Sequence, residues 1–494
     1  MIRVLIVTFL CFSFSINDGL GQISFVKSLN SAKEEIPFCI KQMGLSYFLS
    51  LRSGEAQWDF WNDLRLLKIN DTGEIAKELF IHGGDSSYFN IHHILPINNS
   101  ELLVVGGCKQ TDIPCAQLWI MRIDTSLNII WDKKYFTNKI CTSNIAVTEG
   151  PTGNLIIAAS ITNLDPMPTL SLIFLEINSN GDSLQSKCYS DGNPLNTDVQ
   201  SIICLNGQYK AFVFGYQSYL PPNSSSQILQ LDSDLNLVEV RAVPNQIEGY
   251  RRAEKINENM YYLTGKAFTP TTHYDVAIAK LNDSEGVIHY NHTGKSGYTP
   301  DYSAWMKCMS LANSNSIYSG GTGNYNGSFY SCNTPNKVLI LSNYDSLLNC
   351  RWTRFYGNDT ACYTLSTMDA TSDGGCIMGS MYYSPSHPEN LLDAVIIKVD
   401  SLGLFTGMPE NAVVPVHEAL VFPNPGQDFL TVQSGPQING ACFKMFDASG
   451  ILVKDIIISS TLEKVNASKI PSGTYLWQIV YKGKIVEKGK WLKQ

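Results

Sequence analysis

The sequence predicts an all-β protein, a seven-bladed β-propeller followed by a small immunoglobulin-like β-sandwich. Three observations lead to this fold class. The chain of 494 residues is too long for one ordinary core, and its 37 Gly and 24 Tyr with only 16% charged residues suit a turn-rich β fold. A strand–turn–strand motif recurs along most of the chain. The sequence then changes in character after residue 407, where a second module is expected.

The first 21 residues, MIRVLIVTFLCFSFSINDGLG, have the pattern of a signal peptide. Arg3 gives a positive start, and the apolar run from Val4 to Phe14 is too short to span a bilayer. The small residues Gly19 and Gly21 predict cleavage before Gln22. No later apolar run is long enough for a membrane helix, so we expect a protein exported to the periplasm and beyond.

The repeat is marked by an Asp or Asn in a turn between two apolar runs, as in LLKINDTGEIAKELF at 66–80. Its turn residues lie 50 to 63 residues apart: Asn70, Asp124, Asn178, Asp232, Asn282, Asp345 and Asp400. An apolar run that often ends in Gly precedes each motif, and one more β-like run precedes most of these. Four strands in each of seven units predict a propeller over 22–406. A β-helix usually has a much shorter repeat, and two tandem sandwiches would not give seven matching turns.

The last unit of this repeat is incomplete, because little sequence follows Asp400 before the linker. The segment QISFVKSL at 22–29 is a strand without a unit of its own. We therefore expect this N-terminal strand to complete the seventh blade and close the ring, which removes two exposed sheet edges.

Aromatic residues concentrate in the loops between the second and third strands and between blades, which emerge on one face of a propeller. Aromatic rings with polar neighbours suit glycan or protein ligands. The alternative is that many of these rings pack between blades as ordinary core. The candidate ligand-binding residues are Trp58, Trp61, Tyr216, Tyr219, Tyr298, Tyr302, Trp305, Tyr382 and Tyr383.

An enzyme is the alternative, in the form of an extracellular polysaccharide hydrolase or lyase with carboxylates on the propeller face. Several acidic residues are available for such a pair: Asp59, Asp63, Asp85, Asp301 and Asp359. Nothing in their spacing selects a pair, and no motif of a nucleophilic or metal-dependent enzyme is present. The sequence therefore favours a binding protein, with no catalytic residue, cofactor or metal assigned.

Metal and nucleic-acid sites find little support. His92 and His93 are adjacent on a predicted strand, so their side chains point to opposite faces. The segment DATSDGG at 369–375 suits a hairpin turn better than a calcium loop. The net charge of −8 argues against a nucleic-acid partner.

The sequence has 13 cysteines, and export permits disulfides. Cys108 and Cys115 are the first candidate pair, because both lie in one loop region. Cys332 with Cys350, or Cys350 with Cys362, are competing pairs, and unpaired buried thiols are the alternative for most of the others.

A linker over 407–418 separates the repeats from a basic module over 419–494. That module has 9 Lys and no Arg against 3 Asp and 2 Glu, a net +4, which leaves −12 for the rest of the chain. A basic module on an acidic body suggests separate roles. Alternating residues predict strands over 429–434, 442–450, 451–458, 473–484 and 485–493.

Four segments of this module carry a resemblance: VFPNPGQDFLTV, FKMFDASGILV, NASKIPSGTYLWQIV and KGKIVEKGKWLKQ. Together they resemble the type A C-terminal sorting domain of the type IX secretion system of Bacteroidota. Phe422 departs from the Tyr usual in that family. The residues that match its motif, with Phe422 in the place of that Tyr, are Phe422, Pro423, Asn424, Pro425, Gly450, Gly473, Thr474, Tyr475 and Lys490.

The resemblance implies a partner and a location for the protein. A domain of this family implies recognition by the type IX secretion machinery and passage of a folded cargo across the outer membrane. It also implies removal of the domain, and either release of the cargo or its attachment to the cell surface. Local chemistry accounts for some of the same residues, since Pro423 and Pro425 fix the chain before the first strand and Asn424 suits a turn.

Overall fold

The computed structural model describes most of the chain between Ser24 and Gln494. The described ranges are 24–29, 33–54, 63–83, 88–109, 117–136, 141–163, 169–189, 196–216, 224–242, 247–268, 274–284, 286–294, 300–325, 337–357, 361–384, 391–404, 419–434, 440–460, 462–481 and 484–494. Within these ranges the regular structure is all β. None of them contains a helix long and apolar enough to cross a membrane.

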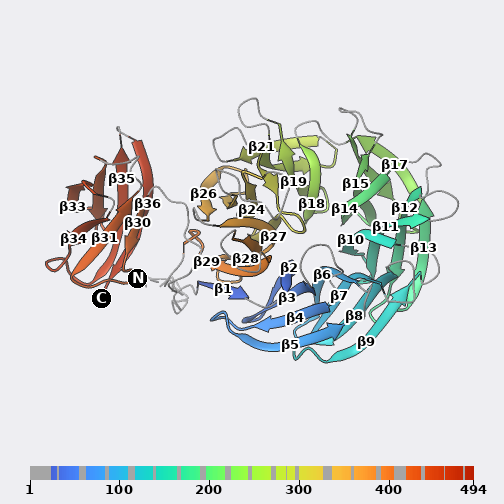
Figure 1. Cartoon of the computed structure of the whole chain (residues 1–494). Helices are drawn as coiled ribbons and strands as arrows, with labels where there is room; N and C mark the ends of the chain where they lie inside the picture. Colours follow the sequence, from blue (N-terminus) through green and yellow to red (C-terminus); the bar gives the residue numbers. More distant parts are fainter. Residues whose placement is uncertain are drawn as a thin grey trace, which may run out of the picture.

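Residues 25–399 form antiparallel sheets that follow one another along the chain and stand around a common centre (Figure 1). The first sheet contains β2 (Glu34–Met43), β3 (Ser46–Gly54), β4 (Asp63–Ile69) and β5 (Ile75–His82). The second contains β6 (Tyr88–Asn98), β7 (Glu101–Lys109), β8 (Gln117–Asp124) and β9 (Ile129–Tyr135). The third contains β10 (Cys141–Glu149), β11 (Leu155–Asn163), β12 (Thr169–Ile177) and β13 (Ser183–Tyr189).

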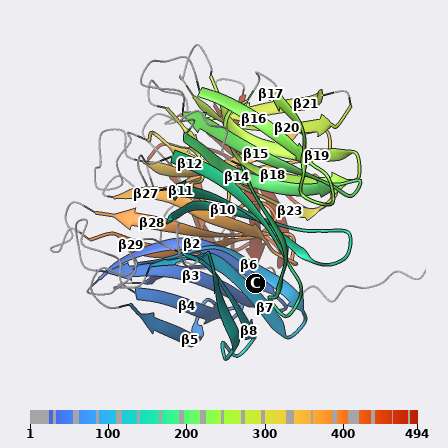
Figure 2. The same ribbon diagram turned by 90° about the vertical axis from the view of Figure 1, so that its right-hand side faces the viewer.

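The following sheets repeat the same order of strands. The fourth contains β14 (Asn196–Leu205), β15 (Gln208–Tyr216), β16 (Ser224–Leu231) and β17 (Leu237–Ala242). The fifth contains β18 (Glu248–Asn257), β19 (Met260–Ala267), β20 (Asp275–Asn282) and β21 (Gly286–Thr293). The sixth contains β22 (Tyr302–Ser303), β23 (Met309–Asn313), β24 (Ser316–Gly323), β25 (Val338–Tyr344) and β26 (Cys350–Tyr356). Seen from the side, the strands of successive sheets lie in layers (Figure 2).

The seventh sheet joins the two ends of this array. It contains β27 (Cys362–Ala370), β28 (Cys376–Tyr383) and β29 (Asp393–Val399), and the N-terminal strand β1 (Phe25–Leu29) pairs with β29. The pairing is antiparallel, from Phe25 opposite Lys398 to Leu29 opposite Ala394. The predicted closure by the N-terminal strand is therefore confirmed for residues 25–29. We call residues 25–399 the ring.

The turns that mark the repeat share one hydrogen-bonding scheme. In the turn after β25, the Asp345 carboxylate accepts bonds from the backbone N–H groups of Leu347 and Asn349, both at 2.9 Å. Asp124 does the same with Ser126 and Asn128, both at 2.8 Å. A short side chain with an acceptor oxygen is what such a turn requires, which explains the Asp and Asn of the repeat.

The innermost strands share a second feature, which the sequence did not reveal. β2 has a bulge between Pro37 and Cys39, and β6, β14 and β27 have bulges at matching positions. In the sixth sheet the interruption is larger, because β22 and β23 both pair with β24 and residues 304–308 loop out between them. Bulges re-aim side chains, and here they occur on the strands next to the centre of the ring.

The C-terminal part, which we call the tail, consists of two sheets. One contains β30 (Ala419–Phe422), β31 (Phe429–Ser434) and β34 (Leu462–Asn466). The other contains β32 (Cys442–Phe446), β33 (Leu452–Ile457), β35 (Gly473–Tyr481) and β36 (Lys484–Lys493). Their shared core includes Leu430, Phe443 and Trp491, all fully buried. The five predicted strands are present, and β30 and β34 were not predicted.

Candidate functional site

The predicted ligand-binding residues fall into two groups. Trp58, Trp61, Tyr219 and Tyr298 lie outside the described residues, and Tyr216 ends β15 with its side chain outside the description. The other four, Tyr302, Trp305, Tyr382 and Tyr383, can be placed. Tyr302 and Trp305 are at or near the centre-facing strand of the sixth sheet, whereas Tyr382 and Tyr383 end β28 of the seventh.

Tyr302 belongs to a compact group of aromatic rings between the fifth and sixth sheets. Its ring centroid lies 5.9 Å from that of Tyr274 and 5.4 Å from that of Tyr325. Phe268 lies 5.8 Å from Tyr274 and is 60% exposed. The Nζ atom of Lys266 stands 4.0 Å from the Tyr274 ring centroid and 5.3 Å from that of Tyr302. We call these five residues the tyrosine cluster.

Backbone hydrogen bonds hold the three tyrosines in place. The N–H of Asp301 donates to the carbonyl of Tyr274 at 2.8 Å, and the N–H of Tyr325 donates to the carbonyl of Pro300 at 2.9 Å. The segment Pro300–Asp301, which enters β22, therefore ties Tyr274 and Tyr325 to Tyr302. The rings come from three separate segments, so their convergence depends on the fold and not on sequence proximity.

Gly321 lets the strand that carries Tyr302 approach closely. A Cβ atom on Gly321 would lie 2.2 Å from the carbonyl oxygen of Tyr302 and 2.6 Å from a methyl group of Val276. Gly106 has the same role in the second sheet, where a Cβ would lie 2.0 Å from the carbonyl oxygen of Asn90. The Gly residues near the end of the second strands are thus required by close backbone contact.

The surroundings of the cluster carry positive charge. Arg251 donates to Gln200 at 3.3 Å and opposes the increase in pKa that burial causes at Tyr302 and Tyr325. Lys337 is 1% exposed, its Nζ lies 5.8 Å from the Tyr325 ring centroid, and burial lowers its pKa to about 8. Three basic side chains, Lys266 included, therefore lie around these tyrosines.

Two carboxylates lie close together beside the cluster. Asp275 and Asp301 both have an oxygen within 3 Å of the position that a Cβ on Gly294 would occupy. They are 6% and 0% exposed, and Asp275 contacts His292 Nδ1 at 2.7 Å while Asp301 accepts from the Asn324 N–H at 2.9 Å. Burial and these contacts favour a bracing role for both carboxylates.

The other predicted carboxylate that the structure describes lies elsewhere. Asp63, on the first sheet, contacts Lys33 at 2.8 Å and His82 at 2.5 Å. It is fully buried and therefore holds the start of β4 to neighbouring segments. The remaining candidates, Asp59, Asp85 and Asp359, lie outside the described residues.

Trp305 occupies the loop of residues 304–308 that interrupts the sixth sheet. It is 38% exposed, and its ring centroid lies 5.9 Å from that of Phe38. Phe38 sits at the bulge of β2 and also lies under the guanidinium of Arg52, 5.5 Å from its centroid. His92, at the bulge of β6, completes this group at 6.3 Å from Phe38, and burial together with Arg52 lowers its pKa to about 4. The bulges thus bring aromatic and basic side chains together.

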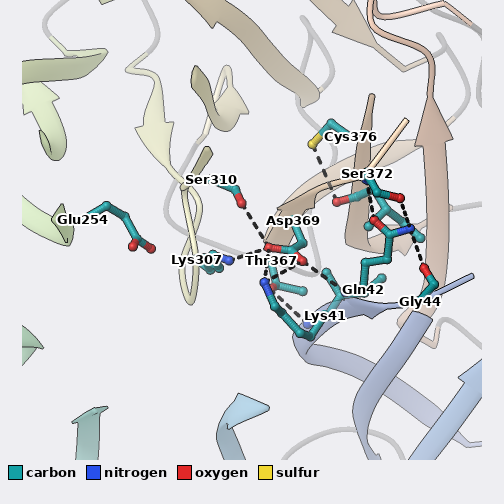
Figure 3. A network of polar contacts seen from close by, with 12 residues as sticks. Lys41, Gln42, Gly44, Glu254, Lys307, Ser310, Thr367, Asp369, Ser372 and Cys376 are labelled. Atoms are coloured by element: carbon teal, nitrogen blue, oxygen red, sulfur yellow. Dashed lines mark hydrogen bonds and ion pairs between the residues drawn. The ribbon is translucent and has the colours of Figure 1, made fainter. Parts of the chain in front are cut away.

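A buried ion network lies on the same strands (Figure 3). The Asp369 carboxylate of β27 accepts from Lys307 at 2.7 Å, Ser310 at 3.0 Å and the backbone N–H of Gln42 at 3.0 Å, and it pairs with Lys41 at 3.1 Å. Burial raises the pKa of Asp369, but the two lysines outweigh it and hold the pKa below its ordinary value. The network joins the first, sixth and seventh sheets, so we assign it to ring closure.

Tyr382 and Tyr383 contribute to packing in the seventh sheet. The Tyr382 ring lies 5.2 Å from that of Tyr363 and packs against a buried core. Tyr383 packs against a small cluster that includes Phe38 and Leu392. Both side chains are half-buried and contact core residues, and their role in ligand binding stays a prediction.

The cysteine pairs expected from the sequence are wrong. Cys108 and Cys350 are free thiols, which excludes pairs of Cys108 with Cys115 and of Cys350 with either candidate. Cys362 is in a disulfide. Cys108 is buried at the end of β7, where burial raises its pKa to about 11 and makes it a packing residue.

The sorting motif of the tail is a set of mutual contacts. Asn424 donates to the carbonyl of Lys490 at 2.9 Å and accepts from the N–H of Leu492 at 2.8 Å. The indole of Trp491 donates to the carbonyl of Pro423 at 2.7 Å. The Pro-Asn-Pro segment is therefore hydrogen-bonded to β36, the basic last strand. The sequence indicates only a turn preference for Asn424 and gives no sign of this contact.

The other motif residues have local roles. Gly450 adopts φ +84° in the turn of Asp447, whose carboxylate accepts from the N–H groups of Ser449 and Ile451, both at 2.9 Å. Tyr475 is buried beside Trp491 and donates to the carbonyl of Pro471 at 2.7 Å. Gly473 and Thr474 open β35, while Phe422 and Lys490 are partly exposed.

A pocket of about 790 Å³ lies between the tail and the ring. Its lining includes Trp352 of the ring, Leu402 just after the ring, and Trp477 of the tail. A salt bridge from Arg354 to Glu487 at 3.1 Å joins the two parts. Because two motif residues of the tail, Gly450 and Lys490, also line this pocket, it belongs to the contact between the parts and lies apart from the tyrosine cluster.

Comparison with known proteins identifies the tail. Residues 420–493 match the family described as secretion system C-terminal sorting domain. The match confirms the resemblance based on the Pro-Asn-Pro, Gly-turn and Ser-Gly-Thr-Tyr segments. It indicates that the chain is cargo of the type IX secretion system, secreted or delivered to the cell surface. No curated protein matches the sequence.

Solved structures similar to the chain include propellers. The polysaccharide lyase Uly1 has 10% identity and a TM-score of 0.43, over 77% of this chain and all of that one. The β-propeller domain of the Trilobed protease from Pyrococcus furiosus has 10% identity and a TM-score of 0.42, over 74% and 95%. PorZ of Porphyromonas gingivalis, a surface component of the type IX secretion system, has 12% identity and a TM-score of 0.30, over 91% and 69%. Likenesses of this size carry no information on function.

Proposed function

We propose that this chain is an exported binding protein whose ring, a seven-bladed propeller, binds glycan or protein through its aromatic face. In this proposal residues 1–21 are the signal peptide, 22–406 the propeller, 407–418 a linker and 419–494 an immunoglobulin-like sorting sandwich. The sorting domain delivers the ring to the outside of the cell. The ring then acts there, at the cell surface or after release.

The observation that carries the binding role is the tyrosine cluster. An exposed phenylalanine and three half-buried tyrosines form a row in which each ring lies within 6 Å of the next, and backbone bonds hold the tyrosine segments together. Aromatic rings that remain partly exposed on a rigid support are typical of recognition surfaces, because they supply contact area at low entropic cost. Trp305 and Phe38 add a second aromatic group on the strands next to the centre.

The enzyme alternative rests on Asp275 and Asp301, which lie close together beside His292. A general acid and base must reach the substrate, however, and Asp301 is fully buried. The geometry therefore supports binding over hydrolysis or lyase chemistry.

Screening the full chain on a glycan array, with a panel of surface proteins in parallel, tests the binding role. We expect binding that Tyr302→Ala reduces by about tenfold or more, because one ring in the middle of the cluster is lost. Tyr290→Ala is the matched control, since Tyr290 lies 36% exposed on the outer strand β21. A chain that binds no glycan and no protein, or binding that Tyr302→Ala leaves unchanged, would contradict the proposal.

A further inference from the structure

We propose that the tyrosine cluster binds acidic saccharides, with the tyrosine rings against the sugar and Lys266 beside its anionic group. The inference rests on the proposed binding function and gives it a ligand class.

The aromatic surface fits a sugar ring. The Tyr302 ring is tilted by 47° to that of Tyr274 and by 67° to that of Tyr325, so the three rings form a faceted surface and not a flat stack. Such facets can contact the apolar C–H face of a sugar, and a phenol hydroxyl can both donate to and accept from sugar hydroxyls. Phe268 extends the surface outward from Tyr274.

The charge of the cluster fits an anion. Lys266 is held over two tyrosine rings, which places an ammonium group among the aromatic faces. Arg251 lies on the centre-facing strand β18, where it donates to Gln200, and the buried Lys337 has its Nζ 5.8 Å from the Tyr325 ring centroid. The two nearby carboxylates, Asp275 and Asp301, are buried and bonded to other groups, whereas the Lys266 side chain is half-buried and more accessible to solvent.

The rest of the chain is acidic, in contrast to the basic side chain at the tyrosine cluster. The chain without its tail carries a net charge of −12, since the whole chain is −8 and the tail +4. A body of this charge repels polyanions in general. An acidic ligand would therefore bind where a cation is accessible, and Lys266 supplies one at the tyrosine cluster.

Calorimetric titration of the full chain with oligosaccharides tests the inference. The probes are a tetramer of galacturonic acid, a sulfated galactose tetramer and, as neutral control, a galactose tetramer. We expect the acidic probes to bind at least tenfold more tightly than the neutral one, because a charge-assisted contact with Lys266 is added. Preference between the two acidic probes assigns the anion as carboxylate or sulfate.

Substitutions then locate the site. Lys266→Met should weaken acidic binding by about tenfold and leave the weak neutral binding unchanged, while Lys266→Arg should retain most of it. Phe268→Ala should weaken the binding of acidic and neutral tetramers alike by about threefold. Because the Phe268 ring is 60% exposed, its loss should leave the protein folded. Lys109→Met is the matched control, since Lys109 ends β7, the equivalent strand of the second sheet.

The outcomes separate this inference from the proposed function. Equal binding of acidic and neutral tetramers, or acidic binding that survives Lys266→Met, overturns the acidic class while glycan binding stands. Tighter binding of a tetraglutamate peptide than of either acidic sugar overturns the saccharide assignment while a protein-binding role stands.

Discussion

The tail and the ring contain the same kind of turn, yet the residues linked to function are arranged differently in the two parts. Asp447 of the tail and Asp345 of the ring both accept backbone bonds from the second and fourth residues that follow. In the tail, the residues of the recognisable motif contact one another, as Asn424 does with β36. In the ring, the repeated residues build the turns, whereas the tyrosine cluster comes from residues that do not repeat. The repeated residues therefore indicate the fold of the ring, whereas residues outside the repeat form its proposed binding site.

Removing the tail should have the largest effect on the cell and little effect on the ring. Deletion of 419–494 should leave the protein in the periplasm, because the sorting domain that the secretion machinery recognises is lost. Protease accessibility of whole cells measures this, with the intact chain as reference. Normal surface delivery of the truncated chain would show that the tail is not the export signal.

Breaking the buried ion network should destabilise the ring and spare the tail. Asp369→Ala leaves Lys41 and Lys307 without their shared carboxylate, so the free energy of unfolding of the ring should fall by about 3 kcal/mol. Denaturant unfolding followed by fluorescence measures the loss. A change below about 0.5 kcal/mol, the range of ordinary surface substitutions, would mean that Asp369 does not secure closure.

Asp369 also makes the stability of the ring depend on pH. The pKa of Asp369 is lowered in the folded protein, so its stabilising contribution is present above its unfolded pKa of about 4 and is lost as the pH falls below that value. The difference in stability between the intact chain and Asp369→Ala should therefore narrow below pH 4. A constant difference across that range would contradict the pairing.

Removing the hydrogen bonds between Asn424 and β36 should have a smaller effect on stability, confined to the tail. Asn424→Ala removes two hydrogen bonds to β36, at about 1 kcal/mol each, and should reduce tail stability by about 2 kcal/mol. Hydrogen exchange of β36 amides reports this, with Asn466→Ala, a turn residue of the same domain, as control. Unchanged exchange would show that the motif does not hold the last strand.

Much of the architecture could be predicted because it depends on local chemistry. The Asp and Asn turns follow from side-chain acceptors and recur at a period that the sequence displays. The orphan strand at residues 25–29 could be placed because an unpaired edge is costly. The tail could be assigned because its motif residues occur in a fixed order.

The site could be predicted only in part, because it depends on long-range convergence. Tyr302 was a candidate because of its loop, and its role in ligand binding stays a prediction. Lys266 was not a candidate, because its side chain meets Tyr274 only in the folded chain. The bulges that place Phe38 beside Trp305 leave no signal in the alternation of the strands. The disulfide prediction was wrong for the same reason. Proximity in sequence suggested a pair of Cys108 with Cys115, whereas the fold buries Cys108 as a free thiol.

The central claim is that the tail carries delivery and the ring carries binding, and one measurement on intact cells tests both. Cells that produce the full chain with Lys266→Met are compared with cells that produce the unaltered chain, for the amount of protein at the surface and for retention of labelled tetragalacturonate. We expect equal surface protein and about tenfold weaker retention by the variant. Equal retention at equal surface protein, or a parallel loss of both, would contradict the division of roles between ring and tail.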